Sequence, residues 1–414
     1  GTFLAQDTIQ VMQYNLLQYG NYFGDCTTST NNVNTKNVHL RTITQYVQPD
    51  IFTVNELSED NSYHQMILNQ VLNIDGVNKY RKAVSFNFAD SYLVNMLYYN
   101  SQKLALYSQD VFYSAVRDID VYTLYYKAGD LAQSRDTIFI TCFVAHLKAG
   151  NTDYNANQRG GMVATAMTYI RTHDLPENIL FMGDLNLYTS AEQAYTNLTY
   201  TYNGTRYFYD PINREGHWNN NSEFQDVHTQ STHANYTDCF SSGGMDDRFD
   251  WIMASESLLN GTEDVLLLTD TYQALGNDGQ HFNLSITDEP ENTSAPSEVI
   301  DALYGMSDHL PVLVKLKINA ALGIEEVAGN ISSVRFANPS NGYLKYHLQL
   351  EDLQSTKVEI FDVFGRLQYQ EVLKPSLNSL SGEIHLNHFA DGVYLWGATD
   401  DSGKSFSRKF LLKK

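Results

Sequence analysis

Cysteine is scarce in this sequence of 414 residues: Cys26, Cys142 and Cys239 are the only three. Three cysteines are too few for the disulfide framework of a small secreted domain, and they lack the paired C-x-x-C spacing of structural zinc sites. The apolar surroundings of Cys142 predict a buried thiol on a strand. Cys26 and Cys239 lie in polar, loop-like stretches, which leaves a single bridge between them open.

Basic residues are also scarce, because 27 Lys and Arg stand against 48 Asp and Glu, a net charge of −21. Proteins that bind nucleic acid or anionic membranes by bulk electrostatics need an excess of Lys and Arg, so this mode of binding is excluded for the chain as a whole. No uninterrupted apolar run reaches the roughly 18 to 20 residues of a membrane-spanning helix. We therefore expect no transmembrane segment.

Hydrophobic residues make up 43% of the chain, which predicts a folded protein with a substantial core. The composition changes near residues 318–330, where a strand-like run gives way to a linker-like stretch. Residues 1–320 carry a net charge of −20 and residues 321–414 one of −1. We predict a catalytic domain over residues 1–320, a linker over 321–331 and a β-sandwich domain over 332–414.

Short β-rich runs alternate with longer, partly helical stretches in the first part, a pattern typical of α/β or α+β domains. The runs cover residues 9–15, 51–55, 92–99, 137–145, 178–182, 249–254 and 312–318. Candidate helices cover 37–47, 62–72 and 157–172.

Polar side chains that could take part in catalysis or bind a ligand occur where these β-rich runs end. Strand ends are where α/β proteins place their active sites. A lone carboxylate such as Asp250, inside an apolar run, is costly to bury unless it has a partner. The polar set, in chain order, is Asn15, Glu56, His146, Asp184 with Asn186, Asp250, and Asp308 with His309.

This ordered set resembles the endonuclease/exonuclease/phosphatase superfamily, also called DNase I-like, over essentially all of residues 8–318. The resemblance implies a four-layer α/β (α+β) sandwich, in which two packed β-sheets are flanked by helices and the active site lies at one sheet end. It also implies divalent-metal-dependent hydrolysis of phosphate esters.

The resemblance also implies roles for these residues. Hard oxygen ligands suit Mg²⁺, with Mn²⁺ or Ca²⁺ as alternatives, and we expect Glu56, the amide of Asn15 and Asp308 to bind the metal. His309 would act as general base, with Asp250 accepting its other N–H and selecting the tautomer. Members of the family differ over whether this pair or the aspartate that Asp184 resembles takes the proton from water. The remaining residues complete the expected set: Asp184 and Asn186 orient nucleophile and phosphate, and His146 donates to the phosphate or the leaving group.

Two features depart from the family pattern. In the deoxyribonuclease branch a glutamate braces the first histidine, but no Glu occurs from residue 60 to 145. Asn95 is the best polar substitute, although an Asn on a strand is also commonly structural. Arg159, at the start of a predicted helix, is a candidate for gripping phosphate, and a plain surface arginine is the alternative.

The second part has hairpin-like alternation that predicts an all-β domain. Its segments 337–342, 358–366 and 391–395, followed by a basic C-terminus, resemble the C-terminal sorting domain of type IX secretion. This resemblance implies recognition by the secretion machinery and export across the outer membrane of a Bacteroidetes-type bacterium, to the medium or the cell surface. The alternative is a small carbohydrate- or protein-binding β-sandwich.

Together these features favour a secreted, metal-dependent phosphodiesterase, with a nuclease as the preferred reading. A sphingomyelinase-like phospholipase, a phosphomonoesterase and a non-catalytic surface adhesin are the alternatives. The complete polar set counts against an adhesin, because a scaffold has no physical reason to keep costly buried acids. No Trp-, Phe- or Leu-rich loop tip that would enter a membrane is evident. The aromatic segments 200–203 and 207–209 could stack bases or simply pack.

Overall fold

The computed structural model describes residues 7–127, 137–202, 205–318, 331–336, 342–350, 355–362, 366–374, 379–401, 405–412 and 414. Contacts along the chain divide it into two compact units, Gly1–Ala320 and Ala321–Lys414. Of the predicted linker, residues 321–330 lie outside the described residues. None of the helices in the described ranges combines the length and apolar character that crossing a membrane requires.

The first unit contains a mixed sheet of six strands in the order β12-β13-β1-β2-β4-β3. Its strands are β1 (Asp7–Tyr19), β2 (Ile51–Ser58), β3 (Tyr80–Lys82), β4 (Leu93–Asn100), β12 (Val265–Ala274) and β13 (Val312–Ile318). Only β1 and β2 pair in parallel, whereas the other neighbours pair antiparallel.

A second sheet of five strands has the order β11-β8-β7-β6-β5. Its strands are β5 (Leu104–Tyr113), β6 (Asp118–Tyr126), β7 (Phe139–His146), β8 (Ile179–Asp184) and β11 (Asp250–Ala254). Its one parallel pair is β7 with β8. These two strands are buried on both faces, which explains why they read as continuous apolar runs without alternation.

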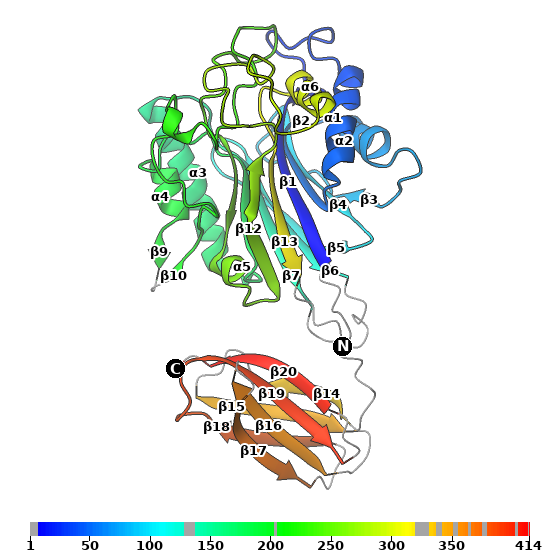
Figure 1. Ribbon diagram of the computed structural model, residues 1–414, viewed down its shortest axis with the longest axis vertical. Helices are drawn as coiled ribbons and strands as arrows, with labels where there is room; N and C mark the ends of the chain where they lie inside the picture. Colours follow the sequence, from blue (N-terminus) through cyan, green and yellow to red (C-terminus); the bar gives the residue numbers. More distant parts are fainter. Residues whose placement is uncertain are drawn as a thin grey trace. The chain divides into compact units, whose positions relative to one another are not determined.

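The two sheets pack face to face, and helices cover both outer faces (Figure 1). One core cluster joins Val11 and Val54 of the first sheet to Val144 and Met182 of the second. The other cluster packs the outer face of the second sheet against α3. Helices α1 (Val33–Val47), α2 (Asn61–Ile67) and α6 (Ser297–Met306) lie on the side of the first sheet; α3 (Asp153–Thr172) and α4 (Gln193–Leu198) lie on the side of the second. The predicted four-layer sandwich is confirmed.

Helix starts follow from capping residues that lie before the apolar periodicity. Helix α1 begins four residues earlier than predicted, because the Asn32 side chain accepts hydrogen bonds from the N–H groups of Asn34 and Thr35. Thr152 caps α3 in the same way, through Asn155 N–H. The remaining small elements are a π-helical turn (Leu68–Leu72), α5 (Glu256–Asn260), β9 (Thr201–Tyr202), β10 (Thr205–Arg206) and a 3-10 turn (Ser222–Phe224).

The second unit is all-β, as predicted, with two antiparallel sheets that share one core. One sheet has the order β14-β15-β18 and the other β17-β16-β19-β20. Leu344 and Leu348 of the first sheet pack with Val358 and Trp396 of the second. The strands are β14 (Ile331–Phe336), β15 (Tyr343–Leu350), β16 (Thr356–Asp362), β17 (Leu367–Leu373), β18 (Ser379–His385), β19 (Gly392–Asp400) and β20 (Ser405–Leu412).

We predict that a chain ending at Ala320 folds on its own, because unit 1 has its own core clusters and unit 2 has a separate one. Scanning calorimetry should show a single cooperative transition, with a midpoint within a few degrees of one transition of the full chain. An insoluble truncated chain, or one without a cooperative transition, would contradict independent folding.

Candidate active site

Both pairs of parallel strands bring polar residues to the same edge of the sandwich. In the register of the sheets Asn15 lies beside Asn55, and His146 lies beside Asp184. Asn15 Nδ2 donates to Asp184 Oδ2 at 2.9 Å, and Asn55 Oδ1 accepts from Asp184 N–H at 2.8 Å. These two bonds cross from one sheet to the other, so the ends of β1, β2, β7 and β8 form one site.

The turn after β8 is built around Gly183 and Asn186. A Cβ on Gly183 would lie 1.8 Å from Ala145 O, so only glycine allows β8 to approach β7 this closely. Asn186 has a left-handed backbone with φ 49°, and its N–H and Nδ2 donate to Asp184 Oδ1 at 3.1 and 2.8 Å. Asn186 therefore orients the Asp184 carboxylate.

Glu56 stands on a strained backbone segment near the end of β2. Its φ is 55°, and Leu17 and Gln18, near the end of β1, are also left-handed, with φ 46° and 47°. Glu56 Oε2 accepts from Gln18 N–H at 3.0 Å and Oε1 from Asn15 Nδ2 at 3.1 Å. Three strained non-glycine residues around one carboxylate indicate that its position matters to function.

Asp250 and His309 form a buried pair at the same edge. His309 Nδ1 lies 2.7 Å from Asp250 Oδ2, and Thr229 Oγ1 donates to the same oxygen at 2.8 Å. Because Asp250 opens β11 directly opposite Asp184 of β8, the pair lies beside that carboxylate, with His309 Nε2 3.8 Å from Asp184 Oδ2. The structure thus brings together the two residues whose pairing the family resemblance implies.

Burial and neighbouring charges shift the ionisation of three groups in opposite directions. Burial lowers the pKa of His309, but Asp250 and Asp184 outweigh it and hold this pKa well above its usual value. Burial and the nearby Arg117 keep the pKa of His146 well below its usual value, so this imidazole is neutral. Burial raises the pKa of Asp184 to about 7, with added repulsion from Asp250 and Glu56.

Glu56, His146 and Asp184 form a group suited to a metal ion. Each offers one ligand atom, and these atoms all lie within 4.8 Å of one another. His146 Nε2 is 3.5 Å from Asp184 Oδ2 and 3.8 Å from Glu56 Oε1. Two carboxylates and a neutral imidazole fit a divalent cation that accepts both oxygen and nitrogen ligands.

The two other predicted metal ligands, Asn15 and Asp308, lie at the edge of this group. Asn15 presents its NH₂ to the carboxylates, because its Oδ1 accepts from Leu17 N–H at 2.9 Å. Asp308 is not part of the group of three, and its Oδ2 accepts from Gln230 Nε2 and Ser241 N–H, each at 3.2 Å. Its Oδ1 is buried and has no hydrogen-bond partner among the described residues, so it remains available to a ligand.

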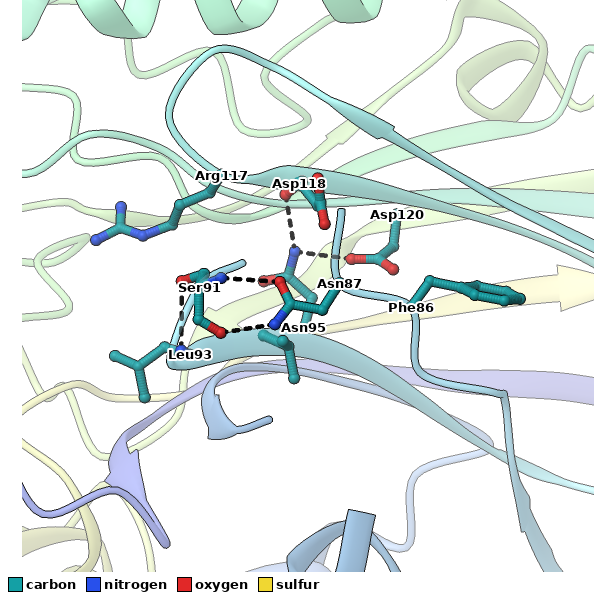
Figure 2. A pocket seen from close by; sticks show the side chains of 9 residues that line it. Phe86, Asn87, Ser91, Leu93, Asn95, Arg117, Asp118 and Asp120 are labelled. Atoms are coloured by element: carbon teal, nitrogen blue, oxygen red, sulfur yellow. Dashed lines mark hydrogen bonds between the residues drawn. The ribbon is translucent and has the colours of Figure 1, made fainter. Parts of the chain in front are cut away.

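Asn95 and Arg159 have partners other than the expected ones. Asn95 links Asn55 Nδ2, at 2.7 Å, to Asp120 Oδ2, at 3.0 Å, and its position is shown in Figure 2. The Arg159 guanidinium is buried and donates to Glu192 Oε2 at 2.7 Å and to the carbonyl oxygens of residues 148 and 150. A phosphate contact would require Arg159 to give up these bonds.

Two site residues were missed in the sequence. Gln230 Nε2 lies 2.7 Å from His309 Nε2, although it belongs to the irregular stretch 197–233, where no periodicity marks it. Arg117, just before β6, donates from Nη1 to Leu147 O at 3.0 Å, next to His146. No pattern in the sequence singled it out, because the strand that it precedes, β6, was not predicted.

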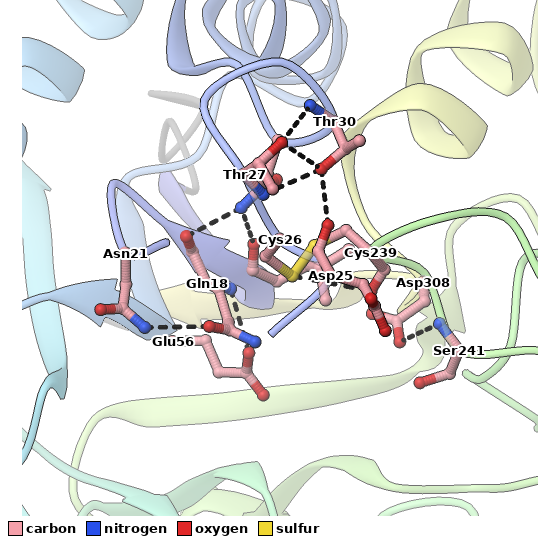
Figure 3. Close-up of a disulfide and its surroundings, with 12 residues drawn as sticks. Gln18, Asn21, Asp25, Cys26, Thr27, Thr30, Glu56, Cys239, Ser241 and Asp308 are labelled. Atoms are coloured by element: carbon pink, nitrogen blue, oxygen red, sulfur yellow. Dashed lines mark hydrogen bonds between the residues drawn. A yellow bond between two sulfur atoms is a disulfide. The ribbon is translucent and has the colours of Figure 1, made fainter. Parts of the chain in front are cut away.

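Cys26 and Cys239 form a disulfide, which settles the pairing that the sequence left open (Figure 3). The bridge joins the loop after β1 to the segment that leads into Ser241, whose N–H binds Asp308. It therefore ties together two segments that support the site, and it suits an oxidising compartment. Cys142 is free and buried on β7, as predicted.

The raised pKa of Asp184 predicts that the metal-free protein loses stability as pH rises from about 4 to 7. Over this range the folded chain keeps a proton that the unfolded chain, with its carboxyl pKa near 3.8, has released. Asp184→Asn should remove this part of the slope and raise the relative stability at pH 7 by about 1 to 4 kcal/mol. Denaturant unfolding in EDTA at several pH values measures how the free energy of unfolding depends on pH.

The exposed Asp174 supplies the control, Asp174→Asn, which should follow the wild-type slope. Burial also raises the pKa of Asp120 to about 7, so the difference between variant and wild type is the quantity to compare. An unchanged slope for Asp184→Asn would contradict the assigned shift.

Comparison with known proteins places the second unit in a family. Residues 336–413 match the family described as "Secretion system C-terminal sorting domain". No curated protein matches the chain.

Similar solved structures include members of the endonuclease/exonuclease/phosphatase family. TDP2 of D. rerio, complexed with single-strand DNA product, is 13% identical with a TM-score of 0.47, covering 75% of this chain and 98% of that one. The endonuclease/exonuclease/phosphatase from Bacteroides vulgatus is 13% identical with a TM-score of 0.46, covering 75% and 99%. The human Nocturnin catalytic domain with bound sulfate is 12% identical with a TM-score of 0.45, covering 76% and 97%.

The family match confirms the predicted export of the protein. A type IX secretion sorting domain directs the chain across the outer membrane of a Bacteroidetes-type bacterium, to the medium or the cell surface, and its C-terminal unit belongs to that family of sorting domains.

Proposed function

We propose that this protein is a divalent-metal-dependent phosphodiesterase that cleaves nucleic acid outside the cell. The observation that supports the proposal is that two groups of side chains lie close together at one edge of the sheets. One is the Asp250–His309 pair, and the other is the group Glu56, His146 and Asp184. A proton acceptor beside a divalent-cation site is the arrangement that hydrolysis of a phosphate ester needs.

Glu56, His146 and Asp184 are the residues that would hold the cation. Asp308 Oδ1, which has no hydrogen-bond partner among the described residues, is a further oxygen of the predicted set. When bound, a divalent cation stabilises negative charge on the phosphoryl oxygens and makes water more acidic. Asn15 keeps the carboxylates of Glu56 and Asp184 close together through its two N–H groups. Without a cation, the charge of these two acids is only partly compensated, which is consistent with the raised pKa of Asp184.

His309 takes the role of general base in this proposal. In its neutral form His309 donates its Nδ1–H to Asp250, which leaves the lone pair on Nε2 to accept a proton from the attacking water. Asp250 and Asp184 give this imidazole a high proton affinity, whereas a cation beside Asp184 would oppose a positive charge on it. The proton affinity of His309 therefore depends on two opposing effects: the carboxylates raise it and a bound cation would lower it.

His146 and Asn186 take supporting roles. His146 is neutral, so the ring nitrogen that does not hold the cation can carry the N–H offered to a phosphate oxygen or to the leaving oxygen. The side chain of Asn186 is already engaged with Asp184 Oδ1 and Leu147 O, so it positions Asp184. The remaining alternatives, a phospholipase of the sphingomyelinase type, a phosphomonoesterase and a non-catalytic adhesin, each give a different substrate profile.

A substrate panel with and without EDTA tests the proposal. It comprises plasmid DNA, RNA, sphingomyelin, inositol phosphates and bis(nitrophenyl) phosphate. We expect cleavage of nucleic acid and of the nitrophenyl diester, abolished by EDTA and restored by Mg²⁺ or Mn²⁺. Cleavage of sphingomyelin or of monoesters alone would identify the corresponding alternative, and no cleavage at all would favour the adhesin.

Glu56→Gln should lower turnover about 100-fold or more and weaken metal binding at least about 10-fold, because the amide removes a ligand charge but keeps the shape. Titration calorimetry with Mn²⁺ measures binding independently of activity. Glu256→Gln is the matched control, since Glu256 is an exposed residue at the start of α5, beyond the end of β11 that lies away from Asp250. Near wild-type turnover of Glu56→Gln at saturating metal would show that the metal site is misassigned.

His309→Ala and Asp250→Ala should each lower kcat by about 10²- to 10⁴-fold, and the double variant should be little worse than either. The reason is that Asp250 acts only through His309. The buried pair His281–Asp278, with a 2.8 Å contact outside the site, provides the control for removing such a pair. Additive losses in the Asp250 and His309 cycle would refute their action as a unit.

A further inference from the structure

The segment between β3 and β4 exposes an unusual set of apolar side chains. Val84, Phe86, Phe88 and Tyr92 are 58%, 41%, 67% and 75% exposed. We call residues 84–92 the aromatic loop. Scattered exposed apolar residues are normal, but four within nine residues form a patch that calls for a partner.

The aromatic loop is held in a defined shape by a buried acid. Asp118 Oδ2 accepts hydrogen bonds from the N–H groups of Phe88 and Ala89, at 2.5 and 3.0 Å, and Asp118 is only 8% exposed. Within the loop, Asn87 donates from Nδ2 to Ser91 O and accepts from Ser91 N–H. Fixed loops hold their rings in place at little entropic cost on binding.

The positively charged side chain of Arg117 lies between the aromatic loop and the candidate active site. Arg117 precedes Asp118, and its Nη1 donates to Leu147 O at 3.0 Å, directly after His146. Figure 2 shows Arg117 and Phe86 on opposite sides of one small pocket, with Asp118 between them. Among the described residues only Nη1 of this guanidinium is hydrogen-bonded, so its other N–H groups can reach a phosphate.

We propose that the aromatic loop stacks the bases of a single-stranded nucleic acid and that Arg117 binds a backbone phosphate between those bases and the cleaved one. This inference rests on the proposed function and names its substrate as a single strand, because only unpaired bases expose the faces that rings stack on. A lipid surface fits less well. The exposed side chains are mostly flat rings, and a cation placed between them and the site matches an extended chain of phosphates.

The sequence left open whether residues 200–203 and 207–209 stack bases or simply pack. Phe208 is buried in the core behind the second sheet. Tyr209 N–H bonds Ala254 O, at the end of β11 opposite Asp250, so this segment lies at the far end of the sheet from the site. Residues 208 and 209 therefore pack, and the aromatic loop is the better-placed candidate for base stacking.

The test uses the full chain and the variant Phe88→Ala/Tyr92→Ala. Its matched control is Tyr46→Ala/Tyr200→Ala, which removes two rings that are 50% and 59% exposed. Tyr46 lies in the last turn of α1, just before β2 begins, and Tyr200 lies next to β9, so both are remote from the strand ends that carry the site. KM is measured with a single-stranded oligonucleotide and with a strand of equal length made of abasic residues.

We expect Phe88→Ala/Tyr92→Ala to raise KM for the oligonucleotide about 10- to 100-fold and to leave KM for the abasic strand within about 2-fold. The control Tyr46→Ala/Tyr200→Ala should not raise KM for the oligonucleotide. Arg117→Gln should reduce the slope of log KM against log salt by about 0.7, the share of one phosphate on a single strand. Equal effects of the variant on both strands, or an unchanged oligonucleotide KM, would overturn the inference. So would loss of binding to phosphatidylcholine vesicles with oligonucleotide KM unchanged, since this would identify a lipid surface as the partner.

Fluorescence anisotropy of a labelled oligonucleotide, measured in EDTA, separates this inference from the proposed function. Weaker binding by the variant than by the control supports base stacking even if the wild-type protein cleaves no phosphodiester, a result that would refute only the proposed function. Equal binding by both variants overturns base stacking even if hydrolysis is confirmed.

Discussion

The hydrogen bond from Asn15 to Asp184 is the contact on which the arrangement of the site depends. It joins the end of β1 in one sheet to the end of β8 in the other, at 2.9 Å and away from solvent. The same Asn15 amide also holds Glu56, and Gly183 lets β8 come close enough to β7 to align Asp184 with His146. An amide is suited to this position because its two N–H groups can serve two carboxylates at once.

The edge of the sandwich concentrates charge that burial makes costly. Asp184 responds with a raised pKa, and His309 keeps its proton strongly because Asp250 lies 2.7 Å away. Elsewhere, the buried Arg248 and Asp210 form a complete bidentate pair, as expected of an ion pair that serves the fold. At the site, by contrast, Asp308 Oδ1 and Asp250 Oδ1 are buried without hydrogen-bond partners among the described residues. Such atoms also occur away from the site, for example His64 Nδ1 and Asn178 Oδ1, so the two carboxylate oxygens fit a ligand site without identifying one by themselves.

Export and chemistry are linked by the disulfide. Cys26–Cys239 joins the loop after β1 to the segment before Ser241, whose N–H binds Asp308, and such bonds persist in the oxidising conditions outside the cytoplasm. The sorting domain sends the chain to those conditions. The net charge of −21 provides no bulk attraction for a polyanion, so the proposed binding of nucleic acid depends on local groups such as Arg117 and the aromatic loop.

The sequence by itself determined that most of these strands exist and which polar residues lie near their ends, because burial periodicity and turn residues act over a few neighbouring positions. The positions of Asn15, Glu56, His146, Asp184, Asp250 and His309 in chain order, and the separate all-β tail, were readable in this way. Strands β3, β5, β6 and β12 were not predicted; β5 is largely exposed and has no apolar run, and β3 has only three residues. Only the tertiary structure decided that the Asn15 amide turns its N–H groups inward, that Arg159 binds Glu192, and that Gln230 reaches His309. These features depend on contacts between segments far apart in the chain, and no local pattern encodes such contacts.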